Sequence, residues 1–217
     1  RYWRVTVRRI GATKVDPLIG GDTSSTAFRV MTVIGLDFGT TNSAIAVADV
    51  GKEATLASFG RGRDTTTSFR SILYFPTKDR SSTVKAETKA GPDAINSYLE
   101  ADSKGRLILS IKSYLGSRLF TSTQINGRFY TLEDLIAIIL RRLRTTVIEQ
   151  FGVTANSVVL GRPVRFAGAE TEADETLALD RLRSPADLAG FSEVTFELEP
   201  VAAAYQYETQ LDHDELV

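Results

Sequence analysis

The strongest constraint on the fold is the stretch VIGLDFGTTNSAIAVAD at residues 33–49, in which two apolar runs enclose a short polar tip. Val-, Ile- and Ala-rich runs on either side of a Gly- and Asn-containing turn are typical of a β-hairpin. The pattern predicts strands at residues 32–38 and 43–50. A purely structural explanation of the tip is a type I′ turn in which the Asp37 side chain accepts hydrogen bonds from nearby N–H groups.

The residue types at this tip also suit phosphate binding. Phosphates are bound by backbone N–H groups that converge on one point, helped by a magnesium ion that a carboxylate holds. Gly39 lets the backbone approach a ligand closely, and Thr40 and Thr41 add hydroxyl donors. An unpaired buried carboxylate is costly, so a metal or its water shell would satisfy Asp37 at the end of a buried strand.

The rest of the chain alternates between strand-like and helix-like segments, which predicts an α/β fold. The clearest helix is expected between Thr131, a good N-cap, and Gly152, which supplies the stop. A second helix is expected to break at Ser184 and Pro185. Further strands are predicted within residues 53–59, 71–76, 157–163 and 193–199, and helices within residues 90–106, 169–191 and 200–208.

Composition excludes several function classes. The net charge of −1 lacks the basic excess that a nucleic-acid groove or an anionic membrane surface attracts. Cysteine is absent and His213 is the single histidine, which argues against thiolate chemistry, disulfides, histidine triads and zinc sites. No apolar run approaches the roughly 20 residues of a membrane helix. We therefore expect a cytoplasmic protein with neither nucleic-acid nor membrane partners.

The N-terminal end of the chain is expected to lie outside the folded part. Residues 1–30 lack the later pattern and read as a non-native or disordered leader, with Met31 as the natural start. An Arg-rich transit peptide is the alternative. The IGGDT stretch at residues 19–23 is expected to be an ordinary turn, and the HDEL stretch at residues 213–216 is not a terminal retention signal because Val217 follows it.

Residues 34–49 resemble the first phosphate hairpin of the actin-like ATPase superfamily, most closely that of the heat-shock protein 70 (DnaK-type) family. Three further segments resemble that family's motifs and come in the order it needs. They are SIKSYLGSRLF at residues 110–120, VVLGRPVRF at 158–166 and ELEPVAAAYQYE at 197–208. The last two are closer to the YegD-like branch than to the DnaK-type chaperones themselves. The resemblance covers residues 32–208.

The resemblance implies a ribonuclease H-like first lobe at residues 31–217, with a mixed sheet flanked by helices and a smaller α+β subdomain inserted at about residues 66–127. The family's second lobe brings another phosphate hairpin, Asp-x-Gly-Gly-Gly-Thr, and no Gly-Gly-Gly occurs in this sequence. We therefore expect an N-terminal lobe fragment, from a truncated or incomplete reading frame, that by itself binds ATP weakly or not at all.

The resemblance also implies a site for ATP or ADP with Mg²⁺. Asp37 would hold the metal through water. The β- and γ-phosphates would be cradled by the residues of the tip, which are Gly39, Thr40, Thr41 and Asn42. Lys112 would reach the γ-phosphate and its attacking water, and Glu199 would lie near the metal and that water. Asp37, Lys112 and Glu199 are thus the expected catalytic set, which agrees with the need of ATP hydrolysis for positioning and charge neutralisation.

Two of these residues, and Pro163 in the segment at residues 158–166, also have structural explanations. Lys112 reads by spacing alone as a surface lysine whose stem lies on apolar surface. Glu199 fits an acid at a helix N-terminus, where the helix dipole favours it. Pro163 would be an interdomain hinge or relay by resemblance, and a strand terminator by local pattern.

Four functions remain open on the sequence. The first is an ATP-hydrolysing, chaperone-like switch protein whose full-length form has unfolded protein clients and co-chaperones as partners. The second is a sugar or metabolite kinase of the same superfamily, and the third is an actin-like filament protein. The fourth is an α/β domain that has lost its nucleotide. The SIKSYLG and EPVAAA segments favour the first.

Overall fold

The structure is a computed structural model, and it describes residues 32–49, 53–60, 65–77, 87–102 and 104–208. The expected leader at residues 1–30 lies outside the described residues, as do Met31, the IGGDT stretch and the HDEL stretch. None of the helices in the described ranges combines the length and the apolar character that a membrane span requires.

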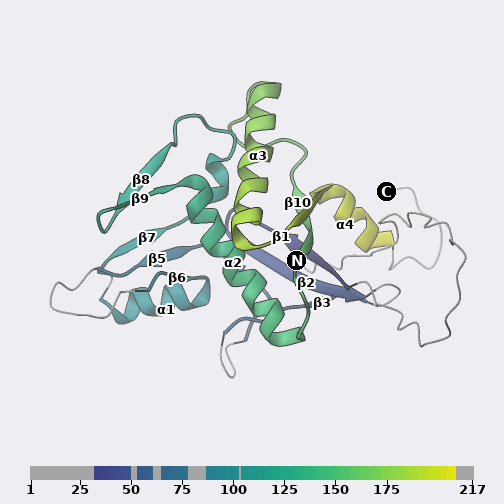
Figure 1. The fold of residues 1–217 in the computed structure, drawn as a ribbon, viewed down its shortest axis with the longest axis horizontal. Coiled ribbons are helices and arrows are strands. Elements are labelled where there is room, and N and C mark those ends of the chain that lie inside the picture. Colours follow the sequence, from purple (N-terminus) through teal and green to yellow (C-terminus); the bar gives the residue numbers. More distant parts are fainter. Residues whose placement is uncertain (1–31, 50–52, 61–64, 78–86, 103, 209–217) are drawn as a thin grey trace, which may run out of the picture.

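A mixed β-sheet of six strands forms the centre of the molecule (Figure 1). Its strands are β1 (Thr32–Asp37), β2 (Asn42–Asp49), β3 (Thr55–Leu56), β4 (Phe69–Arg70), β10 (Ser157–Arg162) and β11 (Glu193–Leu198). β1 is antiparallel to β2 and parallel to β10, and β10 is parallel to β11. β3 and β4 pair antiparallel with β2. The carboxyl ends of β1, β10 and β11 therefore meet at one edge of the sheet, beside the predicted polar tip.

Two long helices, α2 (Leu132–Phe151) and α3 (Glu172–Ala189), lie side by side against this sheet (Figure 1). Each begins with a capping box, built by Thr131 in α2 and Thr171 in α3, and each ends at a glycine with positive φ. These end signals are local, and the sequence predicts both helices. A third helix, α4 (Glu199–Glu208), follows β11 without an intervening loop.

The core lies between α2 and the sheet. The buried residues of α2 recur at helical spacing, and they pack with alternate apolar residues of β1, β2 and β10. From the helix these include Leu132, Leu135, Ile136, Ile139, Leu140, Leu143 and Val147, and from the sheet Ile34, Leu36, Ile45, Val47, Val158 and Leu160. The apolar periodicity of the sequence therefore marked the face of α2 that is buried.

A smaller group of short elements lies beside α2 (Figure 1). They are β5 (Leu73–Phe75), β6 (Lys89–Ala90), α1 (Pro92–Glu100), β7 (Arg106–Ile108), the 3₁₀ helix η1 (Ile111–Tyr114), β8 (Ser122–Ile125) and β9 (Arg128–Thr131). Ile72, Tyr74 and Ala94 form a small apolar cluster of their own, but Phe75 and Ile111 belong to the main core. This part therefore shares the core of the main sheet.

The predicted α/β class is confirmed as a mixed sheet flanked by helices. The predicted hairpin, the helix opened by Pro92 and the helix capped by Thr131 are also confirmed. Among the described residues that follow residue 60, Thr66 forms an antiparallel bridge with Phe59, and Phe69 and Arg70 form β4 on the edge of β2.

The predicted helix break at Ser184 and Pro185 is wrong, because α3 continues through both residues. A proline inside a helix removes one backbone hydrogen bond and crowds the preceding turn. Here Pro185 is buried together with Leu182 and Ala186, where α3 packs on α2. Tertiary packing therefore keeps the helix continuous where local propensity would end it.

Candidate functional site

The connection between β1 and β2 is a compact loop rather than the type I′ turn. Such a turn needs positive φ at both central residues, and neither Thr40 nor Thr41 has one. A Cβ atom on Gly39 would overlap the backbone carbonyl oxygen of Asn42. Glycine is therefore required at this position by the close approach of the loop to itself, and the two threonine side chains are exposed at the tip.

Two buried serines hold the base of this loop. The Gly39 N–H donates to Ser43 Oγ at 3.3 Å, and Ser43 Oγ shares a hydrogen bond of 2.8 Å with Ser71 Oγ. The Ser71 N–H donates to the Thr41 carbonyl at 2.9 Å. The loop is thus fastened to the segment after β4. The sequence offered one signal for this, since Ser43 directly follows the tip, but none for Ser71.

Asn42, an expected phosphate ligand, takes part in the same fastening. Its Oδ1 accepts a hydrogen bond of 3.2 Å from the Arg70 guanidinium, which belongs to β4. Asn42 and Arg70 are also direct partners in the pairing of β2 with β4. The observed geometry therefore gives the Asn42 side chain a role in bracing the loop.

Lys112 and Glu199, two of the three expected catalytic residues, form an ion pair. Lys112 Nζ lies 2.6 Å from Glu199 Oε1, although the residues are 87 positions apart in the chain. The side chains are only 11% and 27% exposed, so the alternative that Lys112 is a surface lysine is wrong. Glu199 is also the first residue of α4, where the helix dipole favours an acid. Its structural and functional explanations are therefore compatible.

Asp37 lies close to this pair, with Gly161 between them. Asp37 ends β1, and Gly161 follows Leu160, which is the partner of Leu36 in the β1–β10 ladder. A Cβ atom on Gly161 would lie 3.5 Å from Glu199 Cγ and 3.9 Å from Asp37 Cα. The structure thus brings Asp37, Lys112 and Glu199 to the edge where the carboxyl ends of the parallel strands meet, the usual place for ligands in open α/β sheets.

Gly161 is a site residue that the sequence reasoning missed. It lies in the GRP stretch of residues 161–163, in which the sequence pattern assigns a role to Pro163 alone. Without a side chain at 161, the space between the Glu199 side chain and the backbone of Asp37 stays open. Pro163 comes directly after the last residue of β10, as expected of a strand terminator, and its role as a hinge stays a prediction.

The carboxylates of Asp37 and Glu199 would suit magnesium better than a metal ion whose ligands all come from the protein. The described part of the chain has no cluster of three or more His, Cys, Asp or Glu residues placed to hold a metal ion. Magnesium usually keeps several waters and takes one or two carboxylates together with phosphate oxygens. Asp37, with Glu199 nearby, offers a donor set of that kind.

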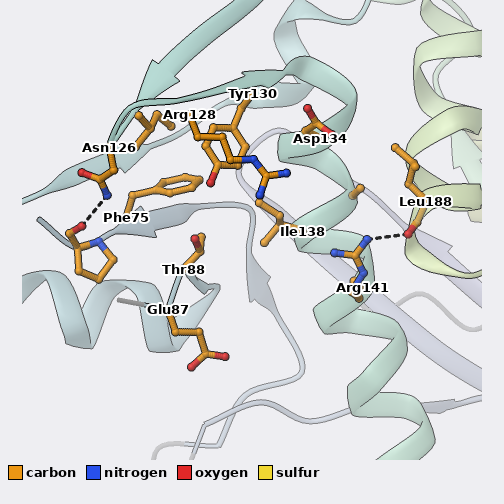
Figure 2. A pocket seen from close by; sticks show the side chains of 13 residues that line it. Phe75, Glu87, Thr88, Asn126, Arg128, Tyr130, Asp134, Ile138, Arg141 and Leu188 are labelled. Carbon is orange, nitrogen blue, oxygen red and sulfur yellow. Dashed lines mark hydrogen bonds between the residues drawn. The ribbon is translucent and has the colours of Figure 1, made fainter. Parts of the chain in front are cut away.

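A cavity of about 700 Å³ lies elsewhere, between the β8–β9 hairpin and α2 (Figure 2). Phe75, Tyr130 and Ile138 line it together with Arg128 and Arg141. None of the expected catalytic residues contributes to it. The candidate site is therefore at an open sheet edge, separate from this cavity.

Comparison of the sequence with models of known protein families gave no match. A functional assignment therefore depends on the four ordered sequence motifs and on the geometry of the site. The motifs alone do not say which residues meet in space. The distances within the site therefore add information that the motifs do not contain.

Proposed function

We propose that this chain is the first lobe of an actin-like ATPase domain of the heat-shock protein 70 type, in its YegD-like branch. In this proposal the β1–β2 loop binds the phosphates of magnesium-bound ATP. Lys112 and Glu199 act on the γ-phosphate and its attacking water. The mixed sheet flanked by helices is compatible with the ribonuclease H-like fold that such a lobe has.

The observation that carries the proposal is the meeting of Lys112 and Glu199 at 2.6 Å, beside Asp37. Three separate segments, each picked out by a motif, supply these residues. The Lys112–Glu199 ion pair lies beside Asp37, the last residue of the strand that carries the first motif. Their convergence therefore supports one shared site.

Each residue has a chemical role in this site. Lys112 would neutralise charge on the transferred phosphate oxygens, while Glu199 would orient the attacking water. Asp37 would hold magnesium through water, and the bound ion would supply further charge neutralisation. The N–H groups of the loop would cradle the phosphates, because a tight loop directs several of them to one point.

A titration of the ¹⁵N-labelled chain with magnesium-bound ATP, followed by NMR, tests the proposal directly and detects weak binding. We expect shifts at the amides of Gly39, Thr40 and Thr41 and at the side chain of Lys112. Magnesium-bound ADP should reproduce the loop shifts and leave Lys112 nearly unchanged. Asp37→Asn should reduce the magnesium dependence, with Asp93→Asn in α1 as a control carboxylate outside the loop.

The same titration contradicts the proposal if ATP at millimolar concentration shifts none of these signals. It also separates the alternatives. A sugar or metabolite kinase should transfer the γ-phosphate to an added acceptor, and a filament protein should pellet with ATP in a concentration-dependent way. Unfolded clients and co-chaperones remain proposed partners of a full-length protein of this branch.

A further inference from the structure

We propose that Arg181 of α3 is a positioning residue that sets where Lys112 lies. Lys112 belongs to η1, a 3₁₀ helix of four residues that has little stability of its own. Its place in the site depends on the core packing of Ile111 and Leu115 on either side of it, and on what holds the segment that follows it, residues 114–120. In the described part of the chain, the Arg181 side chain binds backbone carbonyls at three positions of this segment.

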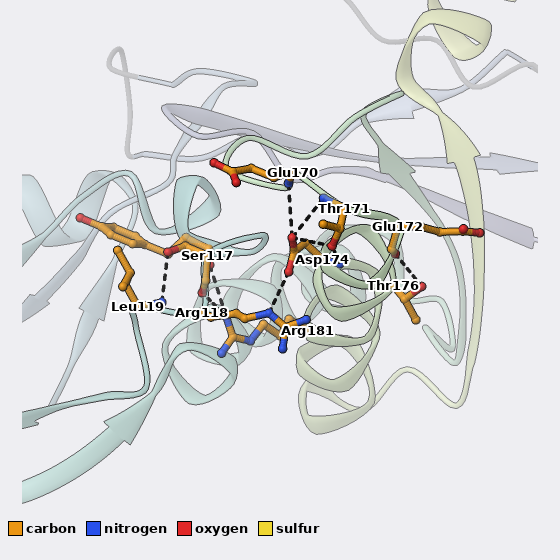
Figure 3. Close-up of polar contacts among 10 residues, drawn as sticks. Ser117, Arg118, Leu119, Glu170, Thr171, Glu172, Asp174, Thr176 and Arg181 are labelled. Carbon is orange, nitrogen blue, oxygen red and sulfur yellow. Dashed lines mark hydrogen bonds and ion pairs between the residues drawn. The ribbon is translucent and has the colours of Figure 1, made fainter.

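The Arg181 guanidinium binds three backbone carbonyls of that segment. Its Nη1 donates to the Ser117 carbonyl at 2.7 Å and approaches the Tyr114 carbonyl at 3.5 Å. Its Nη2 donates to the Phe120 carbonyl at 3.2 Å. Figure 3 shows Arg181 beside Ser117, where the segment passes the start of α3. One side chain thus fixes the end of η1 and the chain beyond it.

The charge of Arg181 is balanced from a third element. Its Nε lies 3.3 Å from Glu133 Oε1 in the first turn of α2, and the two side chains are only 14% and 25% exposed. The guanidinium therefore uses donors on all three of its nitrogens. A lysine has one compact ammonium group and could not reproduce this planar fork of contacts.

Close packing at Gly116 also holds this segment. A Cβ atom on Gly116 would lie 2.8 Å from the Ala169 nitrogen and 2.9 Å from the Ala167 carbonyl oxygen, so the segment packs directly on the backbone before α3. The Leu115 N–H donates to the Lys112 carbonyl at 3.2 Å, which links this docking to Lys112. The docking of the segment is therefore linked to the position of Lys112 beside Glu199.

The experiment compares Arg181→Lys with Arg183→Lys, a matched control on the same helix. Arg183 also donates to a backbone carbonyl, that of Val194, and does not contact the segment. The first measurement is the rate at which an acylating reagent modifies Lys112, followed by mass spectrometry with Lys89 as internal reference. Hydrogen exchange of residues 111–120 is recorded in parallel.

We expect Arg181→Lys to speed acylation of Lys112 and exchange of the segment about tenfold or more, the effect of losing a charge-assisted hydrogen bond. Lys89 and the control variant should stay within about twofold of wild type. Equal rates at Lys112 in both variants, or equal acceleration at Lys89 and throughout the chain, would overturn the proposal. If Arg181→Lys does not fold, Gly116→Ala takes its place with the same expected result.

The functional consequence rests on the proposed function, in which Lys112 reaches the γ-phosphate. Arg181→Lys should then weaken binding of magnesium-bound ATP about tenfold and leave that of ADP unchanged, whereas a merely structural role would weaken both. If wild type binds neither nucleotide, the proposed function fails while the acylation rates still decide the role of Arg181. If ATP binds and both affinities fall together, the positioning role fails.

Discussion

At the scale of single residues, the candidate site depends on groups that have few alternatives. The ion pair of Lys112 and Glu199 is largely shielded from water, so removing either partner leaves a charge that is poorly compensated. Gly39 and Gly161 matter because they lack a side chain: a Cβ atom at Gly39 would overlap the Asn42 carbonyl oxygen, and one at Gly161 would occupy space beside Glu199. The site is thus defined as much by absent side chains as by charged ones.

The strongest effect on chemistry is expected for Lys112→Ala. Removing one preorganised charge-stabilising group typically lowers the rate by ~10²–10³. We expect a loss of that size in single-turnover ATP hydrolysis by an ATPase that contains this lobe. Lys104→Ala, at a lysine outside the site, is the control. A loss of less than about threefold for Lys112→Ala would contradict the assigned role.

A different outcome is expected for Gly39→Ala. The added Cβ would overlap the Asn42 carbonyl oxygen, so the loop must rearrange. Forced overpacking of this kind costs about 1–3 kcal/mol of stability, which urea unfolding can measure. ATP-induced shifts at the loop amides should be lost as well. Thr40→Ala, one residue further along, should keep wild-type stability, and equal unfolding stability of the two variants would refute the steric argument.

At the scale of elements, the first residues of α2 and α3 are set by hydrogen bonds between residues close together in the sequence. α2 and α3 begin with the same capping box, a threonine paired with an aspartate three residues later. In α3 the aspartate, Asp174, also holds an ion pair of 2.8 Å with Arg118 from the segment after η1 (Figure 3). The start of α3 is therefore bound to the segment that positions Lys112.

The cap of α2 should contribute measurably to stability. Thr131→Ala removes the hydroxyl that accepts from the Asp134 N–H at 3.1 Å. Loss of such a cap costs about 1 kcal/mol, within a range of roughly 0.5–2 kcal/mol. Equilibrium urea unfolding measures the change, with Thr131→Ser expected to retain most of the stability. No difference between the alanine and serine variants would show that the cap is dispensable.

Asp174 should make stability depend on pH in a defined window. The Arg118 guanidinium, the Thr171 hydroxyl and the Thr171 N–H lower the pKa of Asp174 to about 2. Since the pKa is lower in the folded chain, its contribution is complete above the unfolded value of about 4 and disappears as pH falls toward 2.

Urea midpoints measured from pH 5 to pH 2 test this window. Between about pH 4 and pH 2, Asp174→Asn should lose less stability than wild type, because the variant lacks a carboxylate whose protonation destabilises the fold. Arg118→Gln should show a smaller effect in the same direction. Parallel curves for wild type and Asp174→Asn would rule out the linkage.

At the scale of the whole molecule, one core joins the main sheet to the smaller elements beside α2. Phe75, Ile111 and Ile125 from that smaller part belong to the same apolar cluster as the strands of the sheet. α2 lies between the two and contacts both. The segment that carries Lys112 is therefore coupled to the sheet that carries Asp37 through packing as well as through the ion pair.

This shared core predicts cooperative loss of structure. Leu140 is fully buried at the centre of α2, and Leu140→Ala should cost about 2–5 kcal/mol. Hydrogen exchange should accelerate both in β1 and β2 and in residues 106–131. Leu99→Ala, at an exposed position of α1, is the matched control and should change little. Acceleration in only one of the two regions would indicate separate folding units.

Much of the fold followed from patterns within a few residues. The β1–β2 hairpin and the two ends of α2 were predicted, because turn chemistry, capping and apolar periodicity act over short distances. Short-range patterns did not place Lys112 and Glu199 in a site. Only the family resemblance did so, and the local pattern around Lys112 indicated a surface lysine.

Tertiary structure decided what joins distant segments. Strand pairing places Gly161 beside Asp37, and packing of η1 brings Lys112 across 87 positions to Glu199. Packing also carries α3 through Pro185. None of these outcomes is encoded by neighbours in the chain, because each depends on buried surfaces and ladder hydrogen bonds that exist only once the whole core has formed.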